Sequence, residues 1–194
     1  MIGNNTIDNG LMEIKEKQMN DAMSVANFFI DKAEKSNKDL TLLKLLKLVY
    51  LAHGYTLAIL NKSFLSRYDK VEAWKFGPVI PSIYHSFKYN GANPIKSCGI
   101  IVTEFEDSGI PELAIPVVQK DIVPVLNFVW NRYSSWSASD LVGLLHKRGT
   151  PWDICFKPNE NIEIPDDMTK AYYAEIFKGL VECGRKIKEA NEAK

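Results

Sequence analysis

The chain alternates between stretches with helical hydrophobic spacing and short irregular connections. Residues 21–35 form the first such stretch, because its apolar side chains recur every three or four positions on one helical face: Ala22, Val25, Ala26, Phe29 and Ala33. The sequence Ser36-Asn37-Lys38 interrupts this pattern. We therefore predict a first amphipathic helix over residues 21–35.

A second helix is predicted over residues 41–60. Thr41 is placed to cap it, and Leu40 and Leu45 occupy the two positions of a hydrophobic staple. In its first turns Lys44 and Lys47 are expected to face water, but residues 48–60 are apolar on nearly every side. A helix that loses its polar face must be surrounded by other elements. We expect this helix to be the centre of the core.

Further along, the pattern predicts several shorter elements. A short helix begins at Pro81 and ends at Asn90-Gly91, and two others cover residues 121–133, with Asp121 as the cap, and 137–146, opened by a Ser137–Asp140 capping box. Residues 99–105 and 112–117 are rich in β-branched side chains and flank Asp107-Ser108-Gly109, which predicts a hairpin.

The last element is a helix over residues 166–191. Its charges alternate outward, and six apolar side chains are expected to pack inward: Tyr172, Tyr173, Ile176, Phe177, Leu180 and Ile187. Residues 1–19 are polar without a clear period, so they are predicted to be a flexible N-terminal arm. The expected fold is mainly α, a single compact helical domain over residues 20–194 with five or six helices and a small β-hairpin insert.

Composition narrows the functional classes. The 194 residues carry 24 Lys+Arg against 24 Asp+Glu, and this balance argues against a nucleic-acid partner, which normally selects a basic excess. The N-terminal segment has no apolar signal core, and the apolar stretch 48–60 is too short for a bilayer, so no membrane partner is expected. Cys98, Cys155 and Cys183 are far apart and form no CxxC motif, which favours reduced thiols in a cytoplasmic protein.

Motifs of enzymes and cofactor sites are missing from the sequence. There is no GxSxG, Walker A, GxGxxG or HExxH pattern, so no catalytic residue, cofactor or metal site is predicted. His53 lies in the apolar part of the central helix and is expected to bond a backbone carbonyl or a hydroxyl, with a functional role as the alternative. His146, beside Lys147 and Arg148, is expected to interact with a helix C-terminus.

The segment Trp74–Pro81 cannot be a helix interior, because Pro78 and Pro81 each lack an N–H. Its aromatic side chains in a proline-fixed run allow two interpretations. They are either an anchor for a binding partner or plugs that fill the core where the chain turns. Pro151-Trp152 is a second rigid aromatic turn of the same kind.

Together these segments resemble the Panacea domain, the SocA-like antitoxin family also described as phage-associated GepA-like proteins. The resemblance covers residues 25–152 and rests on the order of its motifs: Lys44-Leu-Leu-Lys-Leu-Val-Tyr-Leu-Ala-His53-Gly54, Glu72-Ala-Trp74-Lys-Phe76-Gly77-Pro78-Val-Ile-Pro81, Ile83-Tyr84-His-Ser-Phe87, and Leu141-Val-Gly-Leu-Leu-His146 with Pro151-Trp152. The family's shared positions, and hence the candidate toxin-binding or motif residues, are His53, Gly54, Trp74, Phe76, Gly77, Pro78, Pro81, Tyr84, His146, Pro151 and Trp152.

The resemblance implies an α-rich fold and an antitoxin without enzymatic activity, which neutralises a cognate toxin encoded by an adjacent gene through direct binding. One branch of the family implies an alternative, a proteolytic adaptor that delivers its toxin to a cytosolic ATP-dependent protease. A third hypothesis, from a different class, is a hydrolase or metal enzyme that uses His53 and His146. The resemblance leaves the identity of the toxin open. Partner choice is expected to depend on the segments that look least like the family: residues 1–20, the hairpin around Asp107 and the helix after Asp166.

Overall fold

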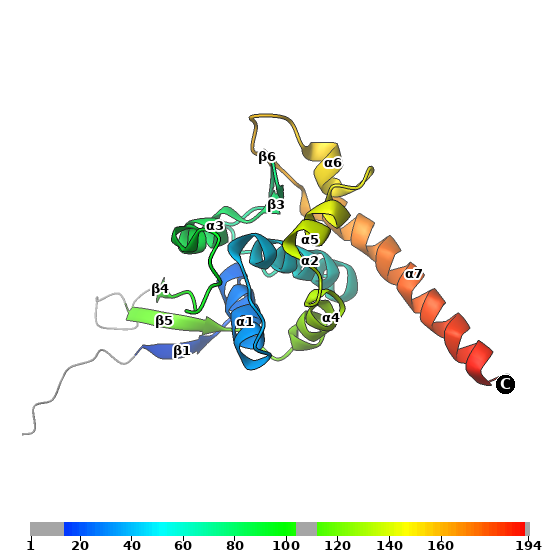
Figure 1. Ribbon diagram of the computed structural model, residues 1–194, viewed down its shortest axis with the longest axis horizontal. Coiled ribbons are helices and arrows are strands. Elements are labelled where there is room, and N and C mark those ends of the chain that lie inside the picture. The colour runs from blue at the N-terminus through cyan, green and yellow to red at the C-terminus, as the bar shows by residue number, and fades with distance from the viewer. Residues whose placement is uncertain (1–13, 104–111, 193–194) are drawn as a thin grey trace, which may run out of the picture.

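The computed structural model describes residues 14–103 and 112–192, and within them it is mainly helical (Figure 1). The helices are α1 (Ala22–Lys35), α2 (Leu42–Leu60), α3 (Pro81–Phe87), the 3-10 helix η1 (Lys88–Asn90), α4 (Val123–Tyr133), α5 (Ala138–Leu145), α6 (Pro151–Cys155) and α7 (Asp166–Glu192). The strands are β1 (Lys15–Gln18), β2 (Glu72–Trp74), β3 (Gly77–Val79), β4 (Ile101–Thr103), β5 (Glu112–Val117) and β6 (Ile162–Glu163). The predicted fold class is confirmed as mainly α, although α6 and most of the strands were not predicted.

Helix α2 lies at the centre of the molecule, as predicted. Helices α1, α3, α4, α5 and α7 and strand β3 all pack against it, and nearly all of its residues from Leu45 to Leu57 are buried. This enclosure explains the loss of a polar face along its sequence, because no side of the helix beyond its first turns meets water. By length and composition alone, α2 is long and apolar enough to cross a membrane. The prediction that its apolar stretch is too short for a bilayer considered only residues 48–60 and was wrong for the whole helix. However, 78% of its apolar window is buried inside the protein, as in the core helix of a globular fold.

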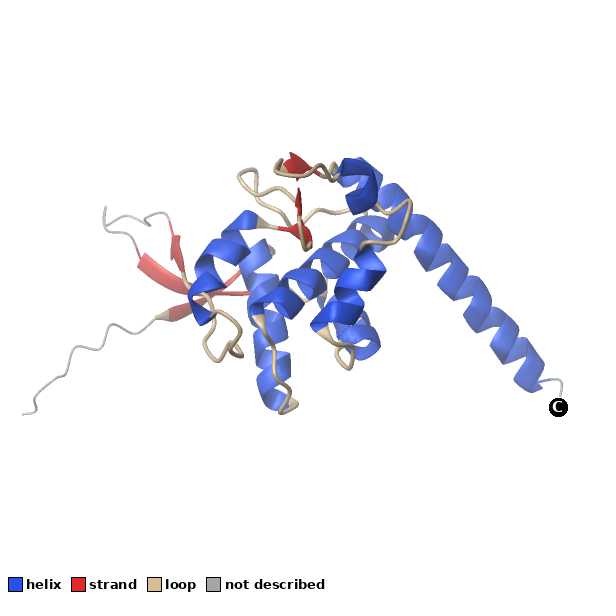
Figure 2. Ribbon diagram, turned by 45° about the horizontal axis from the view of Figure 1, so that its top comes forward, coloured by secondary structure: helices blue, strands red, loops and turns tan. Residues whose placement is uncertain are grey.

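The strands form two small sheets on different sides of the helical body (Figure 2). One sheet has the order β1–β5–β4, in which β1 pairs in parallel with β5 and β4 pairs antiparallel with it. The β4–β5 pair agrees with the predicted hairpin, whose turn around Asp107 lies outside the described residues. The other sheet has the order β3–β2–β6 and is antiparallel throughout. The single hairpin insert of the prediction is therefore replaced by two three-stranded sheets.

Two predicted boundaries change for local reasons. Residues 15–18 were expected in the flexible arm, but they form β1, because their backbone groups pair with β5. Residues 1–13 of that arm lie outside the described residues. The segment 74–81, for which a helix interior was excluded but no strand was predicted, contributes to a β2–β3 hairpin over residues 72–79 in which Trp74 pairs with Gly77. Gly77 has a φ of +103°, a conformation that side chains other than glycine rarely adopt, and this closes the turn.

Some predicted helix ends and polar positions were wrong. Thr41 is the N-cap residue of α2 but makes no capping bond with its side chain, and α4 begins after Ile122 and so is not capped by Asp121. The capping box of Ser137 and Asp140 is confirmed. Neither predicted surface lysine of α2 is free in water. Lys44 is half-buried and donates to the Ser134 carbonyl over 2.7 Å, and Lys47 is fully buried.

Helix α7 packs against α2 only through its first half and then extends away from the body (Figures 1 and 2). Tyr173 is buried, whereas Ile187 is 57% exposed and Ile176 is 39% exposed. The inward packing predicted for the whole apolar stripe is thus correct for Tyr173 but wrong for these two isoleucines. No other described element reaches far enough to cover the second half of this helix.

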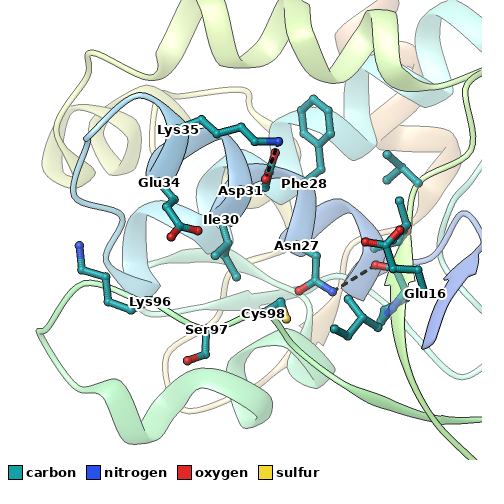
Figure 3. Close-up of a pocket in the computed structure, with 15 residues that line it drawn as sticks. Glu16, Asn27, Phe28, Ile30, Asp31, Glu34, Lys35, Lys96, Ser97 and Cys98 are labelled. Carbon is teal, nitrogen blue, oxygen red and sulfur yellow. Dashed lines mark hydrogen bonds and ion pairs between the residues drawn. The ribbon is translucent and has the colours of Figure 1, made fainter. Parts of the chain in front are cut away.

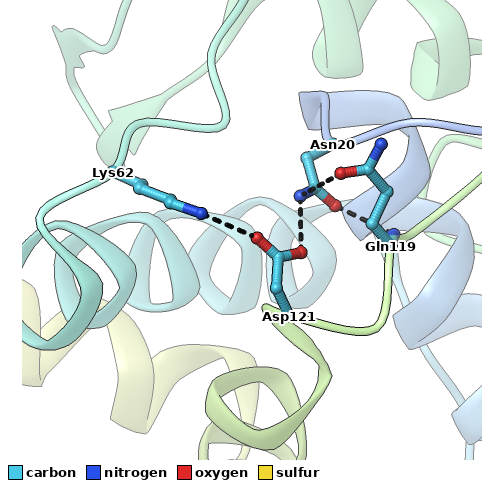
Figure 4. A network of polar contacts seen from close by, with 4 residues as sticks. All are labelled: Asn20, Lys62, Gln119 and Asp121. Carbon is cyan, nitrogen blue, oxygen red and sulfur yellow. Dashed lines mark hydrogen bonds and ion pairs between the residues drawn. The ribbon is translucent and has the colours of Figure 1, made fainter.

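A cavity of about 590 Å³ opens between α1, the β1–β5 edge and residues 96–98 (Figure 3). Next to it, a polar network joins the connections that enter α1 and α4 (Figure 4). Asn20 donates to Asp121 over 2.9 Å and accepts from the backbone N–H of Gln119 over 2.9 Å, while Lys62 reaches Asp121 over 3.1 Å. The bond from Asn20, followed by that from Lys62, lowers the pKa of Asp121, so its carboxylate stays ionised and holds the three segments together.

The contact between α2 and α7 yields a stability prediction. A Cβ at Gly54 would overlap the Tyr173 ring, with Cγ only 2.7 Å away, and this ring is enclosed by the core. Gly54→Ala should lower the free energy of unfolding by about 1–3 kcal/mol, because overpacking forces the ring and the backbone apart. The matched control is Gly179→Ala in α7, which has open space among the described atoms and should gain about 0.5–1 kcal/mol. Urea denaturation of both variants tests this, and an unchanged Gly54→Ala midpoint would contradict it.

Candidate functional site

Most of the candidate residues converge on the β2–β3 hairpin. Trp74, Phe76, Gly77 and Pro78 belong to it, and the hairpin meets side chains from α2, α3 and α6 and from His146 at the end of α5. We use the name hairpin cluster for the group that includes these contacts: Lys47, Trp74, Phe76, Gly77, Pro78, Tyr84, His146, Trp152 and Phe156. Pro81 and Pro151 start the helices α3 and α6 that bring Tyr84 and Trp152 to the cluster.

The hairpin rests on a buried amine. Lys47 of α2 is completely buried and its Nζ donates a hydrogen bond to the Pro78 carbonyl over 2.9 Å. Burial lowers the pKa of Lys47 to about 7, because the charged ammonium loses its hydration. A Cβ added at Gly77 would lie 2.8 Å from this Nζ. Gly77 is therefore required twice, once by its positive φ and once by the closeness of the amine.

A stack of three rings supports the hairpin from α5 and α6. The imidazole of His146 lies flat on Trp152, with centroids 3.5 Å apart and planes 4° apart, and Trp152 stacks on Phe156 at 4.7 Å. The Trp152 indole N–H donates to the Trp74 carbonyl over 2.8 Å, so the stack is fixed to β2. Burial, followed by the charge of Lys47, lowers the pKa of His146. Its Nε2 is buried and has no hydrogen-bond partner among the described residues.

Trp74 is held on the other side of the hairpin. Its indole N–H donates to the Glu72 carboxylate over 2.8 Å, and its ring meets the edge of Tyr84 at 4.9 Å. Glu72 also forms an ion pair with Lys70 over 3.3 Å. Trp74 and Trp152 thus fix the position of the hairpin, as the core-plug interpretation expected.

Phe76 behaves differently from the other aromatic residues of the cluster. It lies at the hairpin turn, is 61% exposed, and has the Lys75 ammonium 5.5 Å from its ring centroid. An apolar ring of this size in water at the end of a braced turn fits the anchor interpretation. The core-plug interpretation therefore fits Trp74, while the anchor interpretation stays a prediction for Phe76.

His53 and Gly54 do not belong to the hairpin cluster. His53 is fully buried, its Nε2 lies 2.8 Å from the Asp166 carboxylate at the start of α7, and its ring meets Phe64 edge-on. The bond with His53 is the main cause that lowers the pKa of Asp166. The expected partner, a backbone carbonyl or hydroxyl, was wrong, because the N-terminal end of α7 brings a carboxylate to this point. His53 and His146 therefore take part in separate contacts and share no site.

Residues 14–103 and 112–192 contain no candidate metal site, because no three of their His, Cys, Asp or Glu side chains lie close enough together to hold an ion. The cysteines are free: Cys98 and Cys183 are exposed and Cys155 is half-buried. What the hairpin cluster offers is a fixed frame of stacked rings and one protruding aromatic side chain, an arrangement suited to contact with another protein surface.

Lys47 and Phe156 are the residues of this site that sequence reasoning missed, and Lys47 is the more consequential. Lysine is almost never buried fully, so its place directly before the apolar run 48–60 looked like the end of a polar face. The available signal was the disappearance of that face directly after Lys47. Burial of the amine follows from the packing of β3 on α2, which no spacing in the sequence states.

The buried amine predicts a pH dependence of stability. The pKa of Lys47 is about 7 in the folded chain and near 10.5 in the unfolded chain, so between these values the unfolded chain binds more protons. The free energy of unfolding should therefore rise as the pH increases from about 7 to 9.5. Lys47→Met removes this contribution, and the difference between the two proteins should grow steadily over the window in urea titrations. A difference that stays constant would show that the amine is not desolvated.

A second test addresses the contact between Lys47 and the turn. Gly77→Ala introduces a Cβ 2.8 Å from the amine, whereas Gly149→Ala introduces one at a similar positive φ of 82° with nothing within 4 Å among the described atoms. Both variants suffer the same kind of backbone strain, on the order of 1 kcal/mol. Gly77→Ala should be destabilised by about 1–3 kcal/mol more than Gly149→Ala, as overpacking is. Equal unfolding midpoints for the two variants would refute the contact.

Most of the hairpin cluster lies in a segment that is similar to a known protein family. Residues 45–153, which contain most of α2 and the hairpin cluster except Phe156, match the family described as "Antitoxin SocA-like, Panacea domain". The chain is 35% identical over 140 residues to Antitoxin SocA of Caulobacter vibrioides, an alignment that covers 72% of each protein. No solved structure matches the chain. The match over more than half of its length, together with this relative, shows that the chain belongs to the SocA-like antitoxin family with a Panacea domain.

Proposed function

We propose that this protein is the antitoxin of a toxin–antitoxin pair and neutralises its toxin by direct binding, with the tip of the β2–β3 hairpin in the contact. The family and the relative named Antitoxin SocA support the antitoxin role. The observation that carries the mode of action is the exposed ring of Phe76 on a frame whose other side chains are buried or half-buried.

The physical reason lies in the cost of ordering an interface. A side chain that is held in place before binding loses less conformational freedom when the complex forms. The frame below Phe76 is fixed by the Lys47–Pro78 and Trp152–Trp74 hydrogen bonds and by the ring stack on Trp152. The hairpin turn therefore presents its aromatic ring at little further entropic cost, and burial of that ring supplies the gain.

The partner in this proposal is a protein toxin, and the adjacent gene is the first place to look for it. Three free cysteines agree with a reducing compartment, so we place the encounter in the cytoplasm. We expect an interface of on the order of 1,200–2,000 Å² in total, the usual size for a stable protein complex. Phe76 contributes only part of such an area, so further contacts with the toxin are required.

The test is co-expression with the product of the adjacent gene. That product should be toxic alone, and the wild-type chain should restore growth and co-purify with it in a defined ratio. Phe76→Ala should weaken the purified complex about 10- to 30-fold, the loss typical of an interface anchor, and should leave the urea midpoint unchanged. The measurement is calorimetric titration of toxin with each variant.

The control is Tyr68→Ala, because Tyr68 is an even more exposed aromatic residue, at 80%, outside the hairpin cluster. It should bind as the wild type does. The purified pair must also be inactive as a toxin without any protease, which separates direct neutralisation from delivery for degradation. A neighbouring product that is harmless, or that never associates with the chain, would contradict the proposal.

A further inference from the structure

The β1–β5–β4 sheet borders a cavity that the family motifs do not explain. Its volume is about 590 Å³, and its apolar wall comes from α1 and β5: Phe28, Ile30, Ile115, Val117 and Val118 (Figure 3). This volume is in the range of pockets that receive a ligand or a large side chain. More than half of the lining residues precede residue 45, where the family match begins. Seven of the lining residues belong to α1, three to β5 and one to β1, so the cavity is built largely from α1.

The rim of the cavity has an excess of negative charge. Its two lysines are engaged, since Lys35 pairs with Asp31 over 2.8 Å and Lys96 reaches Asp39 over 3.7 Å. Glu16 and Glu34 form no ion pair within the described residues. They enter the cavity rim from β1 and α1, on opposite sides of the apolar wall in Figure 3. Both carboxylates are exposed, so each is free to pair with a cation that a binding partner brings.

An exposed apolar strip continues from the cavity along the sheet. Val102 of β4 and Leu113 of β5 are direct cross-strand neighbours, 66% and 36% exposed. Because alternate residues of a strand share a face, Leu113 lies on the same side of β5 as Ile115 and Val117, which line the cavity. Apolar surface of this kind next to a polar rim is typical of a protein contact site.

From these observations we infer that the cavity is a second contact surface for the same toxin, and that it receives an apolar side chain adjacent to a lysine or arginine. This inference rests on the proposed function. The apolar side chain fills the space against Ile30 and Ile115, and the neighbouring cation pairs with Glu34 or Glu16. Such a pairing of charges across an interface sets partner choice and association rate more than affinity. The cavity is then a determinant of which toxin is bound.

The chain contains its own reporter for this contact. Cys98 lines the cavity and is exposed, and Cys183 is exposed on the outer half of α7, away from the cavity. A thiol reagent such as N-ethylmaleimide attacks both in the free chain. In the purified complex with the toxin, the rate of modification of Cys98 should fall at least 10-fold relative to Cys183, read by mass spectrometry of the digested peptides.

The outcomes separate this inference from the proposed function. If a complex forms and Cys98 reacts at the same rate as in the free chain, the cavity is not a contact surface and the inference is wrong, while direct binding stands. If no complex forms at all, the proposed function itself fails. Protection of Cys98 alone, with Cys183 unchanged, supports the cavity.

A charge test completes the design. The double variant Glu16→Gln/Glu34→Gln should bind the toxin about 10-fold more weakly and lose part of the salt dependence of the association rate. The control Glu175→Gln removes an exposed acid from α7 and should bind as the wild type does. If the double variant and the control show equal affinities and salt dependences, the cation is not part of the contact.

Discussion

The amine of Lys47 is the point on which the hairpin cluster depends. Helix α2 is enclosed by five helices and by β3, so a lysine in its second turn has no path to water. Among the described residues, the Nζ of Lys47 donates its hydrogen bond to the Pro78 carbonyl. Proline has no N–H to donate, but its carbonyl oxygen still accepts. This single bond ties the centre of the core to the most exposed turn of the cluster. The absence of a side chain at Gly77 makes the approach possible.

Neighbouring residues of the hairpin cluster differ in the contacts that they make. Trp74, Trp152 and Tyr84 use their rings and indole N–H groups to hold β2 and β3, so their loss would loosen the frame. Phe76, two residues from Trp74, makes no such bond and can be changed with little effect on the fold. In the proposed function, affinity for the toxin and stability of the frame are therefore assigned to different side chains. Beside the β1–β5–β4 sheet, Asn27 bonds the backbone of Gly99 and the carbonyl of Pro116 beneath the cavity, which is open to solvent. Asn27 thus holds the structure together, while the cavity itself stays available for contact.

Helical spacing predicted α1, α2, α4 and α7, because each has an apolar face of several turns that only one periodicity can produce, and a capping box located α5. Short strands carry no comparable signal. Strand β1 has the polar sequence Lys-Glu-Lys-Gln, and it forms because β5 offers an open edge, which is a property of the folded sheet.

The candidate site shows the same difference between local sequence patterns and long-range contacts. Trp74, Gly77 and Trp152 were found through motifs, since aromatic, glycine and proline residues mark fixed turns in any context. Lys47 and Phe156 were missed, because their roles arise from contacts across long stretches of chain. His53 was correctly placed in the interior, but its partner Asp166 lies 113 residues away and could not be found by spacing.

Helix α7 has a consequence for how order spreads through the chain. A helix in water must first form a costly nucleus, and a free segment of about 15 residues gains barely enough from propagation to overcome it. Here the packing of Tyr173 on α2 supplies that nucleus, and the outer turns grow from it with help from the Arg185–Glu189 and Lys188–Glu192 pairs. The outer half of α7 is thus helical because of a contact that lies several turns away, at Tyr173. Loosening Tyr173 would shorten the helix at the opposite end, about 30 Å distant by the rise of 1.5 Å per residue.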